Sequence, residues 1–125
     1  MSNSESLLNF FNITEGMKST LRYNSLRSGR KESSAEHSYR LGLMAFIVAQ
    51  DLKLRVSIEK SMKLALIHDL AEALVGDIDF IEITKGTITK EEKSKMEYNA
   101  IRQIVNTLGG ENGEEIQSLW CEYEE

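Results

Sequence analysis

The chain of 125 residues contains no proline and only one cysteine, Cys121. Average usage of about 5% would give roughly six prolines. Because proline breaks helix interiors, its complete absence favours a mostly helical chain. A single cysteine excludes an internal disulfide framework and is typical of a reducing compartment. We therefore expect one helical domain over residues 1–125, long enough to bury a core of its own.

Long apolar runs and a cationic leader are also missing. No apolar stretch approaches the roughly 20 residues of a membrane span, and the first residues carry Glu5 without a positively charged start. The formal net charge is −5, which argues against binding a nucleic-acid polymer through a basic surface. We expect a chain that binds no membrane and resides in the cytoplasm, with the nucleus as the alternative.

Basic residues nevertheless gather in one segment that has no acidic residue. They are Lys18, Arg22, Arg27, Arg30 and Lys31. A solvated cationic loop is the simpler interpretation of this segment. An anion-binding rim is the alternative, and it requires a catalytic centre nearby.

Helix start and stop signals divide the chain into segments. An amphipathic opening helix ends at Gly16. Ser33 or Ser34 can cap a second helix that runs to about Leu54. Since this second helix is apolar nearly all round, we expect it to be central.

Three more helices are predicted after the second one. Ser57 is a good N-cap for a third helix, which Gly76 closes. Thr89 opens a fourth helix, with Glu92 completing a capping box. A last short helix carries an apolar stripe that a second copy of the chain can bury, formed by Ile116, Leu119, Trp120 and Tyr123. No strand is predicted, so the fold class is an all-α bundle of about five to six helices.

Both histidines of the chain lie near acidic residues on apolar helices. His68 and Asp69 are adjacent, about 100° apart on a helix, and Glu72 lies on the same side one turn on. His37 begins the second helix, from which its side chain can point towards the third. Taken singly, these residues are more simply a core histidine and surface acids. Taken together they predict a metal site, because imidazole and carboxylate suit Mn²⁺, Fe²⁺, Co²⁺ or Ni²⁺, and buried unpaired carboxylates are costly.

Two segments resemble a known family. ESSAEHSYR at residues 32–40 and LALIHDLAEALVGDI at residues 64–78 resemble the HD-domain metal-dependent phosphohydrolases, in particular their 5′-deoxynucleotidase branch. That branch also carries an arginine and a large aromatic residue about fifteen positions before the first histidine, where Arg22 and Tyr23 stand. The resemblance extends from about residue 21 to residue 108 and includes LWCEYE near the end.

The resemblance implies hydrolysis of the 5′-phosphate of nucleoside monophosphates, preferentially deoxynucleotides, by a homodimer. The implied metal ligands are His37, His68 and Asp69; the implied catalytic residues are Glu72 and Asp77; the implied substrate-binding residues are Arg22, Tyr23, Arg27 and Lys31. The ion would lower the pKa of its bound water, and the glutamate would take a proton or steer the nucleophile. Tyrosine replaces the usual tryptophan of the family, so sugar discrimination can differ.

One departure from the family keeps alternatives open. The family places a fourth ligand, an aspartate, on a helix after the LW-x-x-Y segment, whereas this sequence ends at Glu125 and has no aspartate beyond Asp79. Either the sequence is a truncated form lacking that C-terminal helix, or water, Asp77 or another chain completes the site. The alternative functions are a degenerate domain that binds a nucleotide or a partner without turnover, and an HD phosphodiesterase or nucleoside-triphosphate hydrolase.

Overall fold

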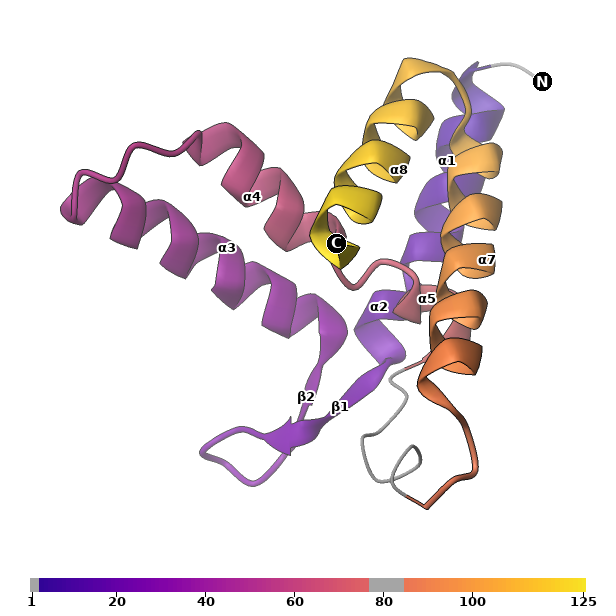
Figure 1. Ribbon diagram of the computed structural model, residues 1–125, viewed down its shortest axis with the longest axis horizontal. Helices are drawn as coiled ribbons and strands as arrows, with labels where there is room; N and C mark the ends of the chain where they lie inside the picture. The colour runs from indigo at the N-terminus through magenta and orange to yellow at the C-terminus, as the bar shows by residue number, and fades with distance from the viewer. Residues whose placement is uncertain (1–2, 77–84) are drawn as a thin grey trace.

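The computed structural model describes residues 3–76 and 85–125, and it is mostly helical, as the sequence predicts (Figure 1). In chain order the elements are α1 (Asn3–Thr14), α2 (Gly16–Ser19), β1 (Leu21–Ser25), β2 (Lys31–Ser33), α3 (Ser34–Asp51), α4 (Ile58–Ile67), α5 (Glu72–Val75), α7 (Lys90–Leu108) and α8 (Gly110–Glu124). None of the helices in these two ranges combines the length and apolarity needed to cross a membrane.

The antiparallel hairpin of β1 and β2 differs from the prediction of a chain without strands. Leu21 pairs with Ser33, and the register is irregular further along the ladder. Gly29 has a φ of +91° in the connecting turn, a conformation that glycine adopts without strain. The strands are short and polar, so no alternation of apolar and polar residues announces them. As a result Arg22 and Tyr23 lie on a strand rather than in a loop.

The three predicted helix starts are confirmed. At α3, the Ser33 hydroxyl accepts from the Glu36 N–H at 3.1 Å, and the Glu36 carboxylate accepts from the Ser33 N–H at 2.9 Å. This reciprocal pair is a complete capping box. Ser57 caps α4, and the Thr89 hydroxyl accepts from the Glu92 N–H at the start of α7. The predicted capping box at Thr89 is wrong in its second half, because Glu92 Oε1 accepts from the Thr89 hydroxyl and not from the Thr89 N–H.

The predicted third helix is two helices joined by a tight turn. α4 ends at Ile67, residues 68–71 form the turn, and α5 begins at Glu72. Within the turn the Glu72 N–H donates to the Asp69 carbonyl at 2.9 Å, an i to i+3 bond that is tighter than an α-helical one. Gly76, with a φ of +76°, closes α5 as predicted. The turn therefore lifts the His-Asp pair out of a regular helix.

The core lies where α1, α7 and α8 meet α2, α4 and α5 (Figure 1). Its buried apolar members are Met17, Ile67, Leu70, Ile101, Ile104, Val105, Leu119 and Trp120. Trp120 is only 5% exposed, because α8 packs on α7 and α4. The prediction that a second copy buries the Trp120 stripe is therefore wrong for Leu119 and Trp120, which the chain buries itself.

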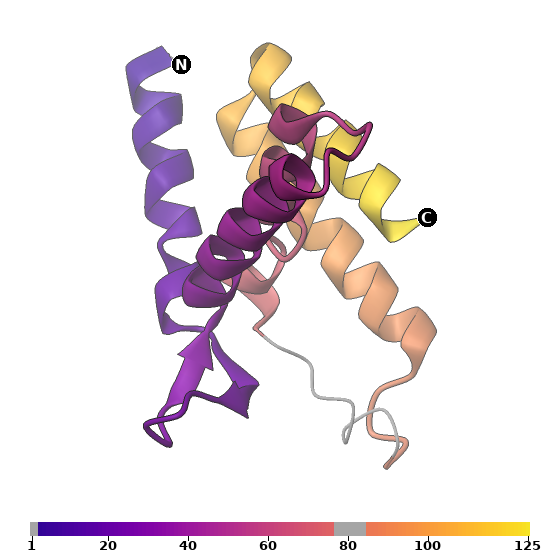
Figure 2. The same ribbon diagram turned by 90° about the vertical axis from the view of Figure 1, so that its left-hand side faces the viewer.

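The long apolar helix α3 was predicted to be central, and this prediction is wrong. α3 packs along α4 and also contacts α2 and β2. Figure 2 views the molecule from this side, with α3 lying in front of the other helices. The exposed apolar residues on α3 include Leu43, Met44, Ile47 and Val48, each close to half exposed. Apolar residues in the sequence indicate which surface favours burial. They do not indicate whether the same chain or another chain buries it.

Candidate metal centre

The structure brings His37, His68 and Asp69 together. One nitrogen or carboxylate oxygen from each residue lies within 4.8 Å of the corresponding atoms of the other two. His37 comes from the first turn of α3, while His68 and Asp69 come from the turn between α4 and α5. Two imidazoles and one carboxylate are a donor set that suits divalent transition metals. The three residues predicted from sequence thus form a cluster with the size and chemistry of a metal site.

The ring of His68 is oriented for ligation. It is 4% exposed, and its Nδ1 lies 2.8 Å from the carbonyl oxygen of Ala65. Since a carbonyl can only accept, Nδ1 carries the proton and Nε2 points its lone pair into the cluster. Nε2 lies 3.0 Å from Asp69 Oδ2. Two acceptors this close are stabilised by a proton or a cation shared between them, so the site fits a metal ion.

The charges around the cluster favour the protonation states that a metal needs. Burial raises the pKa of Asp69, but the hydrogen bond and charge of His68, together with Arg22, hold that pKa below its usual range. Burial and the nearby Arg22 lower the pKa of His37. Burial also lowers the pKa of His68, yet the hydrogen bond and charge of Asp69 outweigh it and leave the pKa raised. Asp69 is therefore ionised and His37 neutral near neutral pH, while a bound metal competes with a proton at His68.

Glu32 stands behind His37. The Glu32 Oε1 atom lies 3.7 Å from His37 Nδ1, and the Glu32 side chain is only 14% exposed. The distance is too long for a hydrogen bond, but a carboxylate on this side of the ring favours an orientation in which Nε2 faces the cluster. The sequence showed Glu32 within the ESSAEHSYR motif without indicating this role.

Glu72 lies beside the cluster with its carboxylate buried. The side chain is at the start of α5 and the residue is 5% exposed. The Ser34 hydroxyl donates to Glu72 Oε1 at 3.0 Å, and Arg22 Nη1 lies 4.0 Å from Glu72 Oε2. The Thr20 hydroxyl lies 3.1 Å from the backbone carbonyl oxygen of Glu72. Ser34 and Thr20 were missed in the sequence, where serine and threonine near a helix start indicate caps.

Arg22 reaches the cluster from β1. Its Nη1 donates to Asp69 Oδ2 at 2.9 Å, in a pair that is about one fifth exposed on both sides. Its Nε is buried and has no hydrogen-bond partner among the described residues. A buried N–H is costly to leave unpaired, so this atom is suited to an oxygen acceptor of a bound ligand. Arg22 is thus the one predicted substrate-binding residue that this geometry ties to the His-Asp cluster.

Lys31 and Tyr23 of the hairpin contact each other and not the cluster. Tyr23 is 61% exposed. Lys31 Nζ donates to the Tyr23 carbonyl at 2.7 Å and lies 5.0 Å from the centre of the Tyr23 ring. Arg27 is exposed in the turn. Substrate binding by Tyr23, Arg27 and Lys31 stays a prediction, as does the role of Asp77, which lies outside the described residues.

Tyr123 is a further neighbour of the cluster that the sequence did not assign. Its ring meets the His68 ring edge to face, with centroids 5.2 Å apart and planes at 64°. Tyr123 is half exposed, and it places an aromatic ring of α8 beside His68. Burial and the charge of Asp69 raise the pKa of Tyr123, so its hydroxyl stays protonated. In the sequence, Tyr123 appeared in the LWCEYE segment of the family resemblance, which did not indicate a place beside His68.

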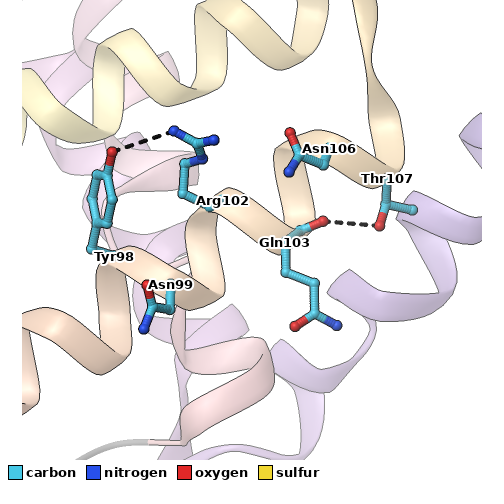
Figure 3. A pocket seen from close by; sticks show the side chains of 6 residues that line it. All are labelled: Tyr98, Asn99, Arg102, Gln103, Asn106 and Thr107. Atoms are coloured by element: carbon cyan, nitrogen blue, oxygen red, sulfur yellow. Dashed lines mark hydrogen bonds between the residues drawn. The ribbon is translucent and has the colours of Figure 1, made fainter.

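A surface hollow elsewhere does not belong to this centre. It has a volume of about 690 Å³ and lies along α7 (Figure 3). The lining residues are Tyr98, Asn99, Arg102, Gln103, Asn106 and Thr107. None of them carries a thiol, an imidazole or a carboxylate. The converging polar side chains, and not this hollow, therefore define the candidate site.

Comparisons with known proteins identify the family and the fold. The family model described as HD domain matches residues 14–125. 5′-Deoxynucleotidase HDDC2 of Dictyostelium discoideum is 40% identical over 94% of this chain and 64% of its own length, and the human protein of that name is 35% identical over 97% and 57%. The crystal structure titled predicted metal-dependent phosphohydrolase from Magnetospirillum magnetotacticum has a TM-score of 0.82 and 30% identity, covering 99% of this chain and 61% of that one. The chain spans less than two thirds of the length of each of these proteins.

The matched region contains every described residue of the candidate metal centre, from Arg22 on β1 to Tyr123 on α8. Most of the chain is matched by one family model, and the fold is similar to that of the solved Magnetospirillum magnetotacticum protein. The chain therefore belongs to the HD domain family.

Proposed function

We propose that residues 1–125 form a single HD domain that hydrolyses the 5′-phosphate of nucleoside monophosphates, with a preference for deoxynucleotides. The observation that carries this proposal is the convergence of His37, His68 and Asp69 within 4.8 Å of one another. The names of the similar proteins, 5′-deoxynucleotidase and metal-dependent phosphohydrolase, support the reaction class. The substrate is a small nucleotide, not a nucleic-acid polymer, and the expected compartment is the cytoplasm or the nucleus.

The proposed cofactor is a divalent transition metal, namely Mn²⁺, Co²⁺, Fe²⁺ or Ni²⁺, held by His37, His68 and Asp69. Three protein ligands leave open positions for water and substrate. A bound ion of this kind supplies an activated water and polarises a phosphoryl oxygen. Water, Asp77 or another chain completes the coordination.

The remaining residues act on the substrate and the nucleophile. Glu72 orients the attacking water and accepts its proton while the water oxygen bonds to phosphorus and the bond from phosphorus to O5′ breaks. The departing O5′ then takes up a proton, which Glu72 gives back directly or through water. Arg22 binds a phosphoryl oxygen through its buried Nε, an atom without a described partner. Tyr23, Arg27 and Lys31 on the hairpin contact the nucleotide, and Asp77 assists near the attacking water.

The first experiment measures phosphate release from dAMP, dCMP and their ribose counterparts, using metal-stripped protein resupplied with Mn²⁺ or Co²⁺. Release that requires metal and favours the deoxy forms is the expected result. Exchanging His68 or Asp69 for alanine should abolish both metal binding, measured by calorimetry, and phosphate release. Lys95→Ala, a change at an exposed residue of α7, is the control for folding and handling. Unchanged turnover in the His68 or Asp69 variant would remove these residues from the site.

The alternative functions give different results in the same assay. Tight deoxynucleotide binding without phosphate release under any metal would indicate a degenerate domain that binds a nucleotide or a partner. Preferred release from triphosphates or cyclic nucleotides would indicate a nucleoside-triphosphate hydrolase or a phosphodiesterase. The similar proteins named above favour the monophosphate reaction.

A further inference from the structure

A buried hydrogen bond joins the two halves of the candidate site. The Ser34 hydroxyl, in a residue with 0% exposure, donates to Glu72 Oε1 at 3.0 Å. Ser34 is the first residue of α3, and Glu72 is the first residue of α5. The helix that carries His37 is therefore linked directly to the carboxylate proposed to handle the proton.

Thr20 closes this link into a small network. The Ser34 N–H donates to the Thr20 carbonyl at 2.9 Å. The Thr20 hydroxyl lies 2.8 Å from the Gly16 carbonyl and 3.1 Å from the Glu72 carbonyl, so its one proton is shared between these acceptors. Backbone and side chain of Glu72 are thus both held by the segment that precedes β1 and by the start of α3.

The hydrogen bond fixes the direction of the carboxylate. Rotation about the last torsion of a glutamate is broad, with no narrow preferred angle. Ser34 engages Oε1, and Oε2 lies on the side of Arg22 Nη1, at 4.0 Å. A hydrogen bond from a buried donor to a charged acceptor is stronger than one between neutral groups. The pair therefore holds Glu72 in one orientation beside the cluster.

We propose that Ser34 is a positioning residue, which acts on the reaction by holding the Glu72 carboxylate in the orientation needed for the attacking water. This inference rests on the role of Glu72 in the proposed function. Ser34 does not touch the substrate in this assignment, so its loss lowers kcat and leaves substrate and metal binding in place.

Ser38 provides a matched control. It lies one turn further along α3, is also a buried serine with 5% exposure, and its hydroxyl has no hydrogen-bond partner among the described residues. Ser34→Ala and Ser38→Ala both remove one buried hydroxyl from the same helix. Only the first removes a contact to Glu72.

The experiment measures kcat, KM and Mn²⁺ affinity for wild type, Ser34→Ala, Ser38→Ala, Glu72→Gln and the double variant of Ser34 and Glu72. We expect Ser34→Ala to lower kcat about tenfold or more, the scale seen for residues that orient a catalytic group. KM and Mn²⁺ affinity should stay near wild type, and Ser38→Ala should change nothing. In the Glu72→Gln background, Ser34→Ala should have little further effect, because the group that it orients is already lost. If Ser34→Ala does not fold, Ser34→Cys replaces it, since cysteine differs from serine by one atom and weakens the donor.

Two results with an active wild type would overturn the inference. One is a Ser34→Ala enzyme as active as Ser38→Ala. The other is an equal loss from Ser34→Ala with and without the Glu72 carboxylate, which would indicate a structural role for the hydroxyl.

A wild type that releases no phosphate with any metal would refute the proposed function instead. The same variants then decide the inference through urea unfolding. Stability losses at Ser34 and Glu72 that are not additive would support the positioning contact, and additive losses would overturn it.

Discussion

At the scale of single residues, Glu72 differs from the three proposed ligands in what surrounds its side chain. The donor atoms of His37, His68 and Asp69 face one another. The Glu72 carboxylate instead accepts from the Ser34 hydroxyl and lies near the Arg22 guanidinium. This environment stabilises a charged carboxylate next to the proposed metal site without placing it among the proposed ligands, which fits proton handling better than ligation.

Glu72→Ala should therefore bind metal and lose most of the rate. The expected loss in kcat is on the order of 10²-fold or more, the usual contribution of general acid–base catalysis. Calorimetry with Mn²⁺ and phosphate release from dCMP would be measured on the same preparation, with Glu91→Ala, a change at an exposed acid of α7, as the control. Loss of Mn²⁺ binding in Glu72→Ala would make Glu72 a ligand.

Residue type and spacing were sufficient to predict the cluster of His37, His68 and Asp69. They did not predict the residues that hydrogen-bond Glu72 beside it. His37, His68 and Asp69 stand out because histidines are scarce and an adjacent acid on an apolar helix needs a partner. Ser34 and Thr20 reach Glu72 across 38 and 52 sequence positions. Contacts over such separations leave no periodic signal, so only the folded chain reveals them.

At the scale of elements, the start of α3 holds the His37-bearing helix in place. The Ser33 and Glu36 capping box is reinforced by Arg30, whose Nη2 lies 2.7 Å from Glu36 Oε2. The side-chain hydrogen bonds of Arg30, with those of Ser33, lower the pKa of Glu36 from 4.5 to about 2. Between about pH 2 and pH 4.5, the folded state therefore binds fewer protons at Glu36 than the unfolded chain does.

This difference predicts a pH-dependent contribution to stability. Because the folded pKa is the lower one, the contribution of Glu36 is complete above about pH 4.5 and is lost as the pH falls towards 2. Urea unfolding should show a lower free energy of unfolding for Glu36→Gln than for wild type at pH 7. This gap in free energy should close as the pH falls to 2. Since both partners are exposed, salt should also narrow the gap. Glu91→Gln, at another first-turn acid, is the control; a gap for Glu36→Gln that is equal at pH 7 and pH 2 would contradict the assignment.

Local sequence signals predicted the helix starts well. They did not predict the turn inside the expected third helix or the β1–β2 hairpin. Ser33, Ser57 and Thr89 all cap helices, because a cap depends on residues only three positions apart. The break at residues 68–71 was not predicted, since its apolar pattern continues that of α4. The hairpin was missed because its short strands are polar and exposed, so neither face carries an apolar pattern.

At the scale of the whole molecule, α3 and α4 present an apolar surface that the described residues leave uncovered. Leu43 and Ile47 lie one turn apart on α3, and Met62 and Leu66 lie one turn apart on α4. These four side chains are between 40% and 60% exposed. The two helices pack along each other, and exposed apolar side chains that gather on neighbouring elements are typical of an interaction surface. The apolar sequence of α3 predicted a buried helix. The expectation that other helices of the same chain bury it was wrong.

We expect this α3–α4 surface to bury itself against a second copy, which moves the predicted homodimer contact away from the Trp120 stripe. A two-fold contact uses the same surface of both copies, so one substitution changes the contact at two places. Sedimentation velocity at micromolar concentration should show a dimer for wild type. Ile47→Glu should weaken it by at least about tenfold in Kd, because the dimer then buries two carboxylates without partners. Gln103→Glu, which adds the same charge on α7, should dimerise normally. A monomeric wild type at tens of micromolar would refute self-association, and an unchanged dimer in Ile47→Glu would place the contact on another surface.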